Sequence, residues 1–212
     1  MFRERPSLPK YTVMYDANLV LDFIKSQKGY MSFEMLTKCL VTLLCLLCGQ
    51  RVQTMAALCT DYMYVDDEKV IFYIPTLLKT TRPVFHQKPL ELVAYPDEDI
   101  CPVSFIKRYL KETGHLRTEG KKGFFLSYSE PYNNVTSTTL ARYVKDVLNK
   151  SGIDITSFAA HSTRAASTSK VNKMLYLAEI NKAAGWSSCE TYAKHYNCVI
   201  DQNFGTALLD AC

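Results

Sequence analysis

Residues 32–49 read SFEMLTKCLVTLLCLLCG and contain the longest apolar run of the chain. A helix is predicted to start near Ser32, with Glu34 in its first turn, and to end at Cys48-Gly49. Because this helix is apolar on nearly every face, we expect it to lie at the centre of the fold. The apolar run, residues 39–48, is about half of the ~20 residues that cross a bilayer, so it predicts a core helix.

Before this helix, the sequence predicts an extended arm and then an amphipathic helix. Pro6 and Pro9 disfavour a helix in the arm, which covers residues 1–15. Asp16 is a candidate N-cap for the helix that follows, and Gly29 is expected to end it. The apolar residues of that helix recur at helical spacing and are Leu19, Val20, Phe23 and Ile24.

Three segments after the apolar helix are rich in β-branched and aromatic residues and predict an antiparallel sheet. They are Tyr62–Val65, Val70–Ile74 and Leu90–Tyr95. The remainder predicts a short strand at Phe124–Leu126 and helices near residues 102–112, 137–150, 162–173, 176–184 and 188–196. The expected fold class is therefore α+β, mainly helical with a small three-stranded antiparallel sheet, in one domain of residues 1–212.

Composition is typical of a folded protein. Apolar residues make up 48% of the 212 residues and charged residues 22%, and 25 basic against 21 acidic residues leave a net charge of +4. These values exclude a disordered chain and a collagen-like repeat. The pI of about 8.5 is below the value of about 9 that alone indicates nucleic-acid binding. The first residues show no secretory signal, so an intracellular protein is expected.

The eight cysteines do not predict a disulfide framework or a zinc site. Cys45 and Cys48 have the spacing of half a zinc site, but no second pair of ligands follows at metal spacing. Both lie in the apolar helix, and a chain of this length builds a core without disulfides. We therefore expect them to be buried core thiols, and we expect no metal site.

Four features carry side chains suited to catalysis, although each alone has an ordinary structural explanation. They are Arg51, directly after the apolar helix, Lys79 in the basic loop between two predicted strands, the pair His161 and Arg164, and Trp186 followed ten residues later by Tyr196. Residues at positions i and i+3 share one face of a helix, so the pair is expected to converge. Taken singly, the features describe a helix-end charge, a solvated loop, a chance pair and core aromatics.

In this order, the four features resemble the tyrosine recombinases, also called the phage integrase family. The resemblance covers the chain from about Ser32 to Ile200, and its spacings (79 − 51 = 28, 161 − 79 = 82 and 186 − 164 = 22 residues) suit the catalytic domain of that family. The strings GQRVQT, HSTRAASTSK and GWSSCETYAKHY are similar to recombinases of eukaryotic mobile elements, the DIRS-like retrotransposons and the Crypton transposons.

The resemblance implies a role for each polar residue in DNA cleavage without a metal, a cofactor or ATP. Tyr196 would attack a backbone phosphate and form a 3′-phosphotyrosyl link. Arg51 and Arg164 would hold the non-bridging oxygens, because a guanidinium donates two parallel hydrogen bonds and keeps its charge. Lys79 would protonate the leaving 5′-oxygen, and His161 would assist proton transfer or orient the phosphate.

Two aromatic positions depart from the simplest family pattern. Trp186 stands where many relatives have histidine, and its indole N–H donates a hydrogen bond but cannot act as an acid or a base. Tyr192 lies four residues before Tyr196 and competes with it as the nucleophile. A spacing of only six residues after Trp186 is short for the family, so Tyr192 is expected to be a packing residue.

The implied partners are double-stranded DNA and further copies of the chain. The expected DNA-binding residues are Arg82, Lys88, Arg142, Lys145, Lys170 and Lys173. Relatives usually carry a core-binding domain before the catalytic one, and this domain is expected to be absent here. The apolar tail, residues 197–212, is expected to dock onto a neighbouring protomer of a tetramer.

The resemblance therefore predicts a site-specific DNA recombinase or integrase of a mobile element, acting in the nucleus. A catalytically inactive DNA-binding or regulatory module derived from such an element is the alternative. A domain with no role on DNA is the third interpretation, and the ordered set of catalytic residues argues against it.

Overall fold

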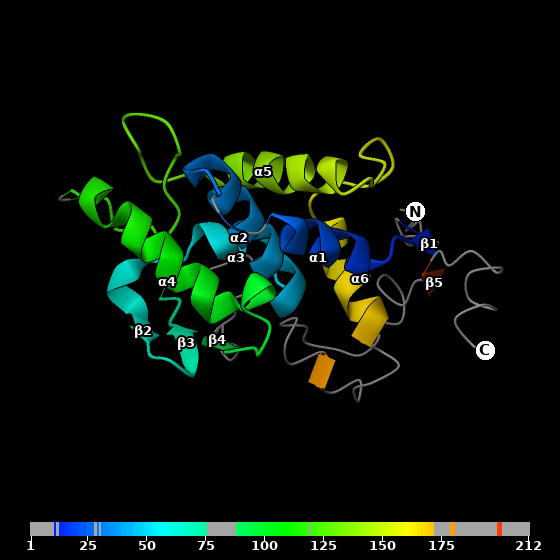
Figure 1. Cartoon of the computed structure of the whole chain (residues 1–212), viewed down its shortest axis with the longest axis horizontal. Coiled ribbons are helices and arrows are strands. Elements are labelled where there is room, and N and C mark those ends of the chain that lie inside the picture. The colour runs from blue at the N-terminus through cyan, green and yellow to red at the C-terminus, as the bar shows by residue number, and fades with distance from the viewer. Residues whose placement is uncertain are drawn as a thin grey trace, which may run out of the picture.

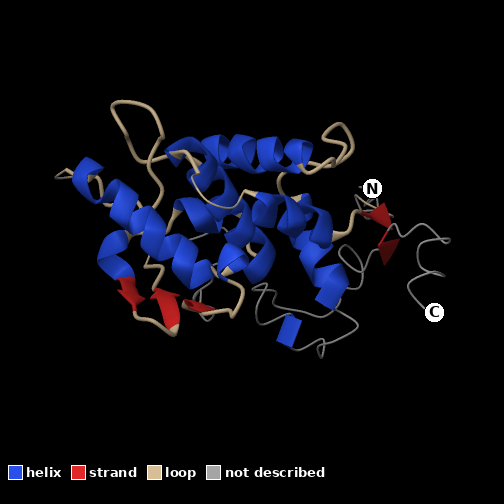
Figure 2. Ribbon diagram, viewed as in Figure 1, coloured by secondary structure: helices blue, strands red, loops and turns tan. Residues whose placement is uncertain are grey.

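The computed structural model describes residues 11, 13–27, 29, 31–75, 88–118, 120–171, 179–180 and 199–200. The predicted fold class is confirmed, since helices form most of this part and a small sheet lies on one side (Figures 1 and 2). The helices are α1 Ala17–Ser26, α2 Phe33–Cys48, α3 Val52–Ala56, α4 Pro102–Thr113, α5 Ser137–Lys150 and α6 Ser162–Val171, with the 3₁₀ turns Thr60–Tyr62, Glu98–Ile100 and Gly114–Leu116. The strands are β1 Val13–Met14, β2 Met63–Val65, β3 Lys69–Phe72, β4 Leu90–Val93 and β5 Val199–Ile200.

The predicted central helix is confirmed as α2. Ser32 Oγ accepts a hydrogen bond from the backbone N–H of Met35 at 3.2 Å, and Gly49 ends the helix in the left-handed region at φ 56°. Nearly all of its side chains are buried, and it contacts α1, α3, α4, α5 and α6. Within the part of the chain that the structure describes, every helix falls short of the length and hydrophobicity that a membrane span requires.

The thiols of α2 belong to the core, as predicted. Cys39, Cys45 and Cys48 are free and buried. Burial disfavours the thiolate, and it raises the pKa of Cys39 and of Cys45 to about 12. Each thiol therefore stays protonated at neutral pH and packs as a small apolar side chain.

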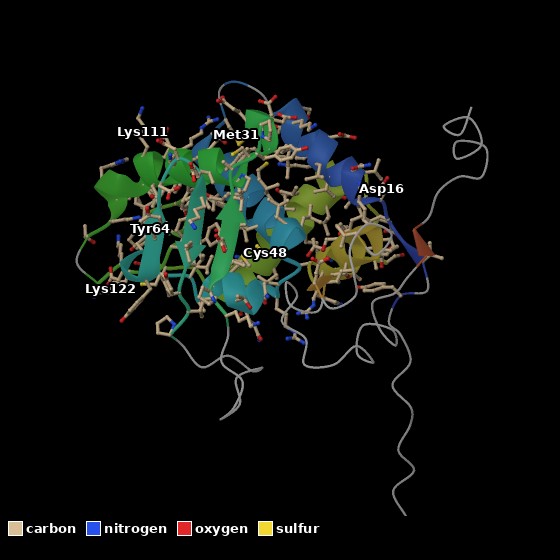
Figure 3. All side chains as sticks on the ribbon, turned by 90° about the horizontal axis from the view of Figure 1, so that it is seen from below. Asp16, Met31, Cys48, Tyr64, Lys111 and Lys122 are labelled. Atoms are coloured by element: carbon tan, nitrogen blue, oxygen red, sulfur yellow. The ribbon has the colours of Figure 1, made fainter. Side chains whose placement is uncertain are left out.

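The three-stranded sheet is also confirmed, in the order β2-β3-β4 with both pairs antiparallel. The Asp66 carboxylate closes the turn between β2 and β3 by accepting hydrogen bonds from the backbone N–H groups of Glu68 and Lys69, at 2.8 and 2.7 Å. Side chains alternate along β3 and β4, so that one face of the sheet joins the core while Val93 on the other face is 64% exposed. Figure 3 looks toward this sheet, with Tyr64 on the edge strand β2.

The predicted short strand at Phe124–Leu126 needs correction. This segment is not a strand, because Gly123 and Leu126 form single bridges with different partners, Cys59 and Asn134. The segment is buried throughout and packs its aromatic rings among Phe72 and Tyr109, so it lacks the alternation of a half-buried strand.

The described end of the predicted arm is extended but belongs to the body of the protein. Tyr11, Met14 and Tyr15 are buried. β1 pairs in parallel with β5, which joins Val13 to Val199 and Met14 to Ile200. Both strands lie beside α6 at one end of the molecule (Figure 1). The arm therefore holds the two ends of the described chain together.

We expect Leu43→Ala to destabilise the protein by about 2–5 kcal/mol, because Leu43 is fully buried in α2 and its removal leaves a cavity. Leu47→Ala is the matched control, since Leu47 lies one turn later on the same helix and is 47% exposed. Its cost should stay below about 1 kcal/mol. Urea unfolding of both variants measures the difference, and equal losses would contradict the central position of α2.

An ion pair joins α2 to α5. Lys38 Nζ lies 2.7 Å from Asp146 and 2.6 Å from Glu34. Burial acts to raise the pKa of Asp146, but the hydrogen bond and charge of Lys38 outweigh it and hold this pKa below its ordinary value. A carboxyl group with a lowered pKa in the folded state stabilises the protein above its unfolded pKa of about 3.9, and this contribution is lost as the pH falls through the folded pKa.

Asp146→Asn is therefore expected to lower the free energy of unfolding at pH 7 by about 1–2 kcal/mol, a figure reduced for the partial exposure of the pair. Between pH 5 and 3 the wild-type protein should lose stability more steeply than the variant, so that the difference shrinks. Asp67→Asn is the control, because Asp67 pairs with Lys107 but its side chain is fully exposed. A difference between wild type and Asp146→Asn that grew in acid would contradict the assignment.

Candidate active site

A cleft of about 720 Å³ opens where the first turns of α3, α5 and α6 meet. These turns come from three distant parts of the sequence. The cleft brings together three of the predicted catalytic residues, Arg51, His161 and Arg164. The other described lining residues are Gln50, Val52, Gln53, Ser137, Thr138, Ala141, Ala159 and Ala160.

Arg51 reaches the cleft because of the way α2 ends. The left-handed backbone of Gly49 turns the chain, and Arg51 then occupies the N-cap position of α3 with extended backbone (φ −77°, ψ 150°). The carbonyl oxygen of Arg51 accepts a hydrogen bond from the backbone N–H of Thr54 at 2.8 Å. Because α3 also packs against α5, Arg51 is carried on a short, anchored turn, and the residue is half-buried.

Arg164 lies in the first turn of α6 and is only 2% exposed. An arginine keeps its charge at all ordinary pH values, so its burial places a permanent positive charge in the wall of the cleft. A guanidinium in this position therefore favours a ligand that carries negative charge.

His161 does not lie on the helix with Arg164, which corrects the predicted geometry. It occupies a turn just before α6, where the backbone N–H groups of Ser162 and Thr163 donate to the carbonyls of Ala159 and Ala160 at 2.8 and 3.4 Å. The two side chains nevertheless line the same cleft. The imidazole is exposed, and its Nε2 lies 3.1 Å from Tyr11 Oη.

The electrostatic character of the cleft suits a phosphate group. Two guanidinium groups and an imidazole line it, and the described lining residues include no carboxylate. The first turns of the longer helices α5 and α6 also face it, which brings the positive ends of their dipoles close to the same volume. Positive charge, oriented N–H groups and partial burial together can bind a phosphodiester and stabilise charge that develops on it.

The polar residues that complete the cleft were not predicted from the sequence. Gln50 and Gln53 flank Arg51, while Ser137 and Thr138 come from the first turn of α5. A helix near residues 137–150 was predicted, and Thr136 caps it, since its Oγ1 accepts a hydrogen bond from the backbone N–H of Thr139 at 3.2 Å. A helix start alone does not reveal which other segments meet there, so the sequence offered no way to place it beside Arg51.

The remaining predicted catalytic and DNA-binding residues divide into two groups. Five lie outside the described residues, namely Lys79, Arg82, Lys173, Trp186 and Tyr196. Lys88 precedes β4, and Arg142 and Lys145 lie on α5, and all three are exposed. Lys170 instead pairs with Asp16 at 3.3 Å, so part of its charge is already balanced within the protein.

No group of three or more histidine, cysteine, aspartate or glutamate residues that could hold a metal ion occurs in the described ranges.

The fold is shared with tyrosine recombinases of known structure. XerA recombinase superposes with a TM-score of 0.64 at 17% identity, over 100% of this chain and 65% of that chain. XerH recombinase bound to its difH substrate gives a TM-score of 0.64 at 17% identity, over 97% of this chain and 53% of that one. A lambda integrase dimer bound to a COC′ core site gives 0.55 at 16% identity, over 92% of this chain and 50% of that one. This chain thus spans between half and two thirds of each relative.

These superpositions define the class: the chain has the fold of a tyrosine recombinase catalytic domain. Residues 15–203 match the phage integrase family, and the chain belongs to that family. Among curated proteins, none matches the sequence.

Proposed function

We propose that this protein is a site-specific recombinase that cleaves and rejoins DNA through a 3′-phosphotyrosyl intermediate. The observation that carries the proposal is the convergence of Arg51, His161 and Arg164 in one cleft. Arg51 and Arg164 are 113 residues apart (164 − 51), and each has the chemistry that a phosphoryl transfer needs. Family membership supports the same reaction.

In the proposed reaction, the cleft holds the phosphodiester and the nucleophile comes from Tyr196. The phenolate oxygen attacks phosphorus, the bond from phosphorus to the 5′-oxygen breaks, and the strand upstream of the break stays attached to the tyrosine through its 3′-phosphate. The 5′-oxygen leaves with a proton from Lys79, and Trp186 donates a hydrogen bond to the phosphate. Arg51 and Arg164 stabilise the transition-state charge, and His161 orients the phosphate or assists the proton transfer. Rejoining is the reverse reaction, with a 5′-hydroxyl as the nucleophile, and it requires no metal or ATP.

We further propose double-stranded DNA and other copies of this chain as the partners. XerH is described bound to difH, and lambda integrase as a tetramer bound to a Holliday junction, which supports both partners by analogy. Residues 199–200 pair with β1 of the same chain, so docking onto a neighbouring protomer would fall to residues 201–212. The exposed Lys88, Arg142 and Lys145 would contact DNA phosphates.

The biological setting is also part of the proposal. The strings around Arg51, His161 and Trp186 resemble recombinases of eukaryotic mobile elements, as described above. Integration or excision of such an element would take place on nuclear DNA, so we propose a nuclear location.

The test is whether the protein forms a covalent adduct with DNA. A pool of nicked duplexes with random sequence around the nick serves as the substrate, because loss of the short 3′ fragment traps the cleaved state. We expect a band on denaturing gels that contains both protein and DNA and disappears after protease digestion. Retention of DNA in native gels without any such adduct would contradict the proposal and favour the inactive DNA-binding module.

A further inference from the structure

The hydroxyl of Tyr11 forms a hydrogen bond with the imidazole of His161, although the two residues are far apart in the sequence. The hydroxyl oxygen lies 3.1 Å from Nε2, and the two ring centroids are 5.8 Å apart. Tyr11 is only 9% exposed, whereas His161 is exposed. The contact therefore joins a buried, well-packed phenol to the accessible imidazole of the cleft.

Tyr11 stands beside the cleft and not in it. Among the described residues, those that line the cleft include His161 but not Tyr11. The phenol therefore contacts the imidazole without occupying the space for a ligand. A hydrogen bond to one ring nitrogen fixes the orientation of a histidine ring. A phenol hydroxyl can donate to that nitrogen or accept from it, so the bond couples the hydroxyl to the tautomer of the ring.

Tyr11 is fixed by ring packing and by the contacts of the residues that follow it. Tyr11 packs on Phe158 with ring centroids 5.5 Å apart, and Tyr15 packs edge-on against the same ring at 5.1 Å. Between the two tyrosines, β1 pairs with β5. Directly after them, Asp16, labelled in Figure 3, pairs with Lys170 of α6 at 3.3 Å. These contacts anchor Tyr11 and residues 13–16 against α6 and the turn before it, so Tyr11 has little freedom to follow a different orientation of the imidazole.

We propose that Tyr11 is a positioning residue that sets the ring orientation of His161 and biases its tautomer ratio. Among the described residues, the charged groups that line the cleft with this imidazole are Arg51 and Arg164. Neither guanidinium accepts a hydrogen bond, so neither can hold a protonated ring nitrogen. The consequence for DNA cleavage rests on the proposed function, whereas the effect on the imidazole does not.

The variant Tyr11→Phe removes the hydroxyl and keeps the ring that packs on Phe158. Tyr15→Phe is the matched control, because Tyr15 packs on the same ring and its hydroxyl accepts a hydrogen bond from Ser162 Oγ at 3.5 Å. The first readout is the ¹⁵N spectrum of the histidine side chains in the protein without DNA, with the His161 signals assigned by their loss in His161→Ala. We expect Tyr11→Phe to shift the His161 signals and change the tautomer ratio, and Tyr15→Phe to leave them in place.

The second readout is the rate of covalent adduct formation. Loss of one positioning hydrogen bond is expected to slow the reaction about tenfold. Tyr11→Phe should add nothing in a His161→Ala background, because the proposed effect of the Tyr11 hydroxyl passes through His161. His161 signals that coincide in wild type and Tyr11→Phe would overturn the proposal, as would equal shifts in Tyr15→Phe. If the wild-type protein forms no adduct, the proposed function fails, and the ¹⁵N spectra still decide the role of Tyr11.

Discussion

The Tyr196→Phe variant is expected to form no covalent adduct with DNA, while it keeps its affinity for the same duplex. A free phenol has a pKa of about 10, so it needs neighbouring positive charge to react as a phenolate at neutral pH. The cleft supplies that charge through Arg51 and Arg164. Phenylalanine retains the ring and lacks the oxygen that would attack phosphorus, so binding should survive and bond formation should not. Denaturing and native gels on the same substrate measure the two properties.

Tyr192→Phe is the matched control for this experiment. Tyr192 lies four residues earlier in the same predicted helix and is the competing candidate nucleophile. We expect this variant to form the adduct within about threefold of the wild-type rate. The opposite pattern, with loss in Tyr192→Phe and retention in Tyr196→Phe, would exchange the two assignments.

The Arg164→Lys variant is expected to slow adduct formation on the order of 10²–10³-fold. Lysine retains the positive charge but loses the planar fork that binds two phosphate oxygens in parallel. Because Arg164 is 2% exposed in the first turn of α6, its geometry is set by the surrounding core and a lysine cannot reproduce it. The rate is measured at saturating DNA, so that weaker binding does not enter the comparison.

The matched control is Arg142→Lys, which makes the same chemical change at an exposed position on α5. It should leave the rate of adduct formation within about threefold of wild type. Thermal melting of both variants checks that the fold is intact. A rate for Arg164→Lys as close to wild type as that of the control would show that Arg164 does not contact the reacting phosphate.

Local sequence patterns predicted the central helix and the three-stranded sheet of this fold. α2 begins after Ser32 and ends at Gly49 as expected, because a capping hydroxyl and a left-handed glycine act within one turn of the helix. The sheet was equally visible, since β3 and β4 alternate between core and surface. The strand predicted at Phe124–Leu126 was wrong. Two consecutive aromatic residues are typical of a strand, but Phe124 packs against both Phe125 and Phe72 in a buried, irregular segment.

The candidate site was predictable in its residue types and not in its geometry. Arg51, His161 and Arg164 were identified by their order along the chain, and the structure brings them to one cleft. The contribution of α5 could not be foreseen, because it depends on how α3 and α5 pack. The same holds for β1 and β5, two-residue strands 186 residues apart (199 − 13), which carry no detectable pattern of their own.

The central claim, that Tyr196 attacks DNA from this cleft, is tested most directly by mapping the covalent bond. The adduct from the nicked duplex is digested with protease and nuclease, and the modified peptide is sequenced by mass spectrometry. We predict a nucleotide attached through its 3′-phosphate to the hydroxyl oxygen of Tyr196. A nucleotide on any other residue, a link through the 5′-phosphate, or unmodified Tyr196 in every adduct would contradict the account.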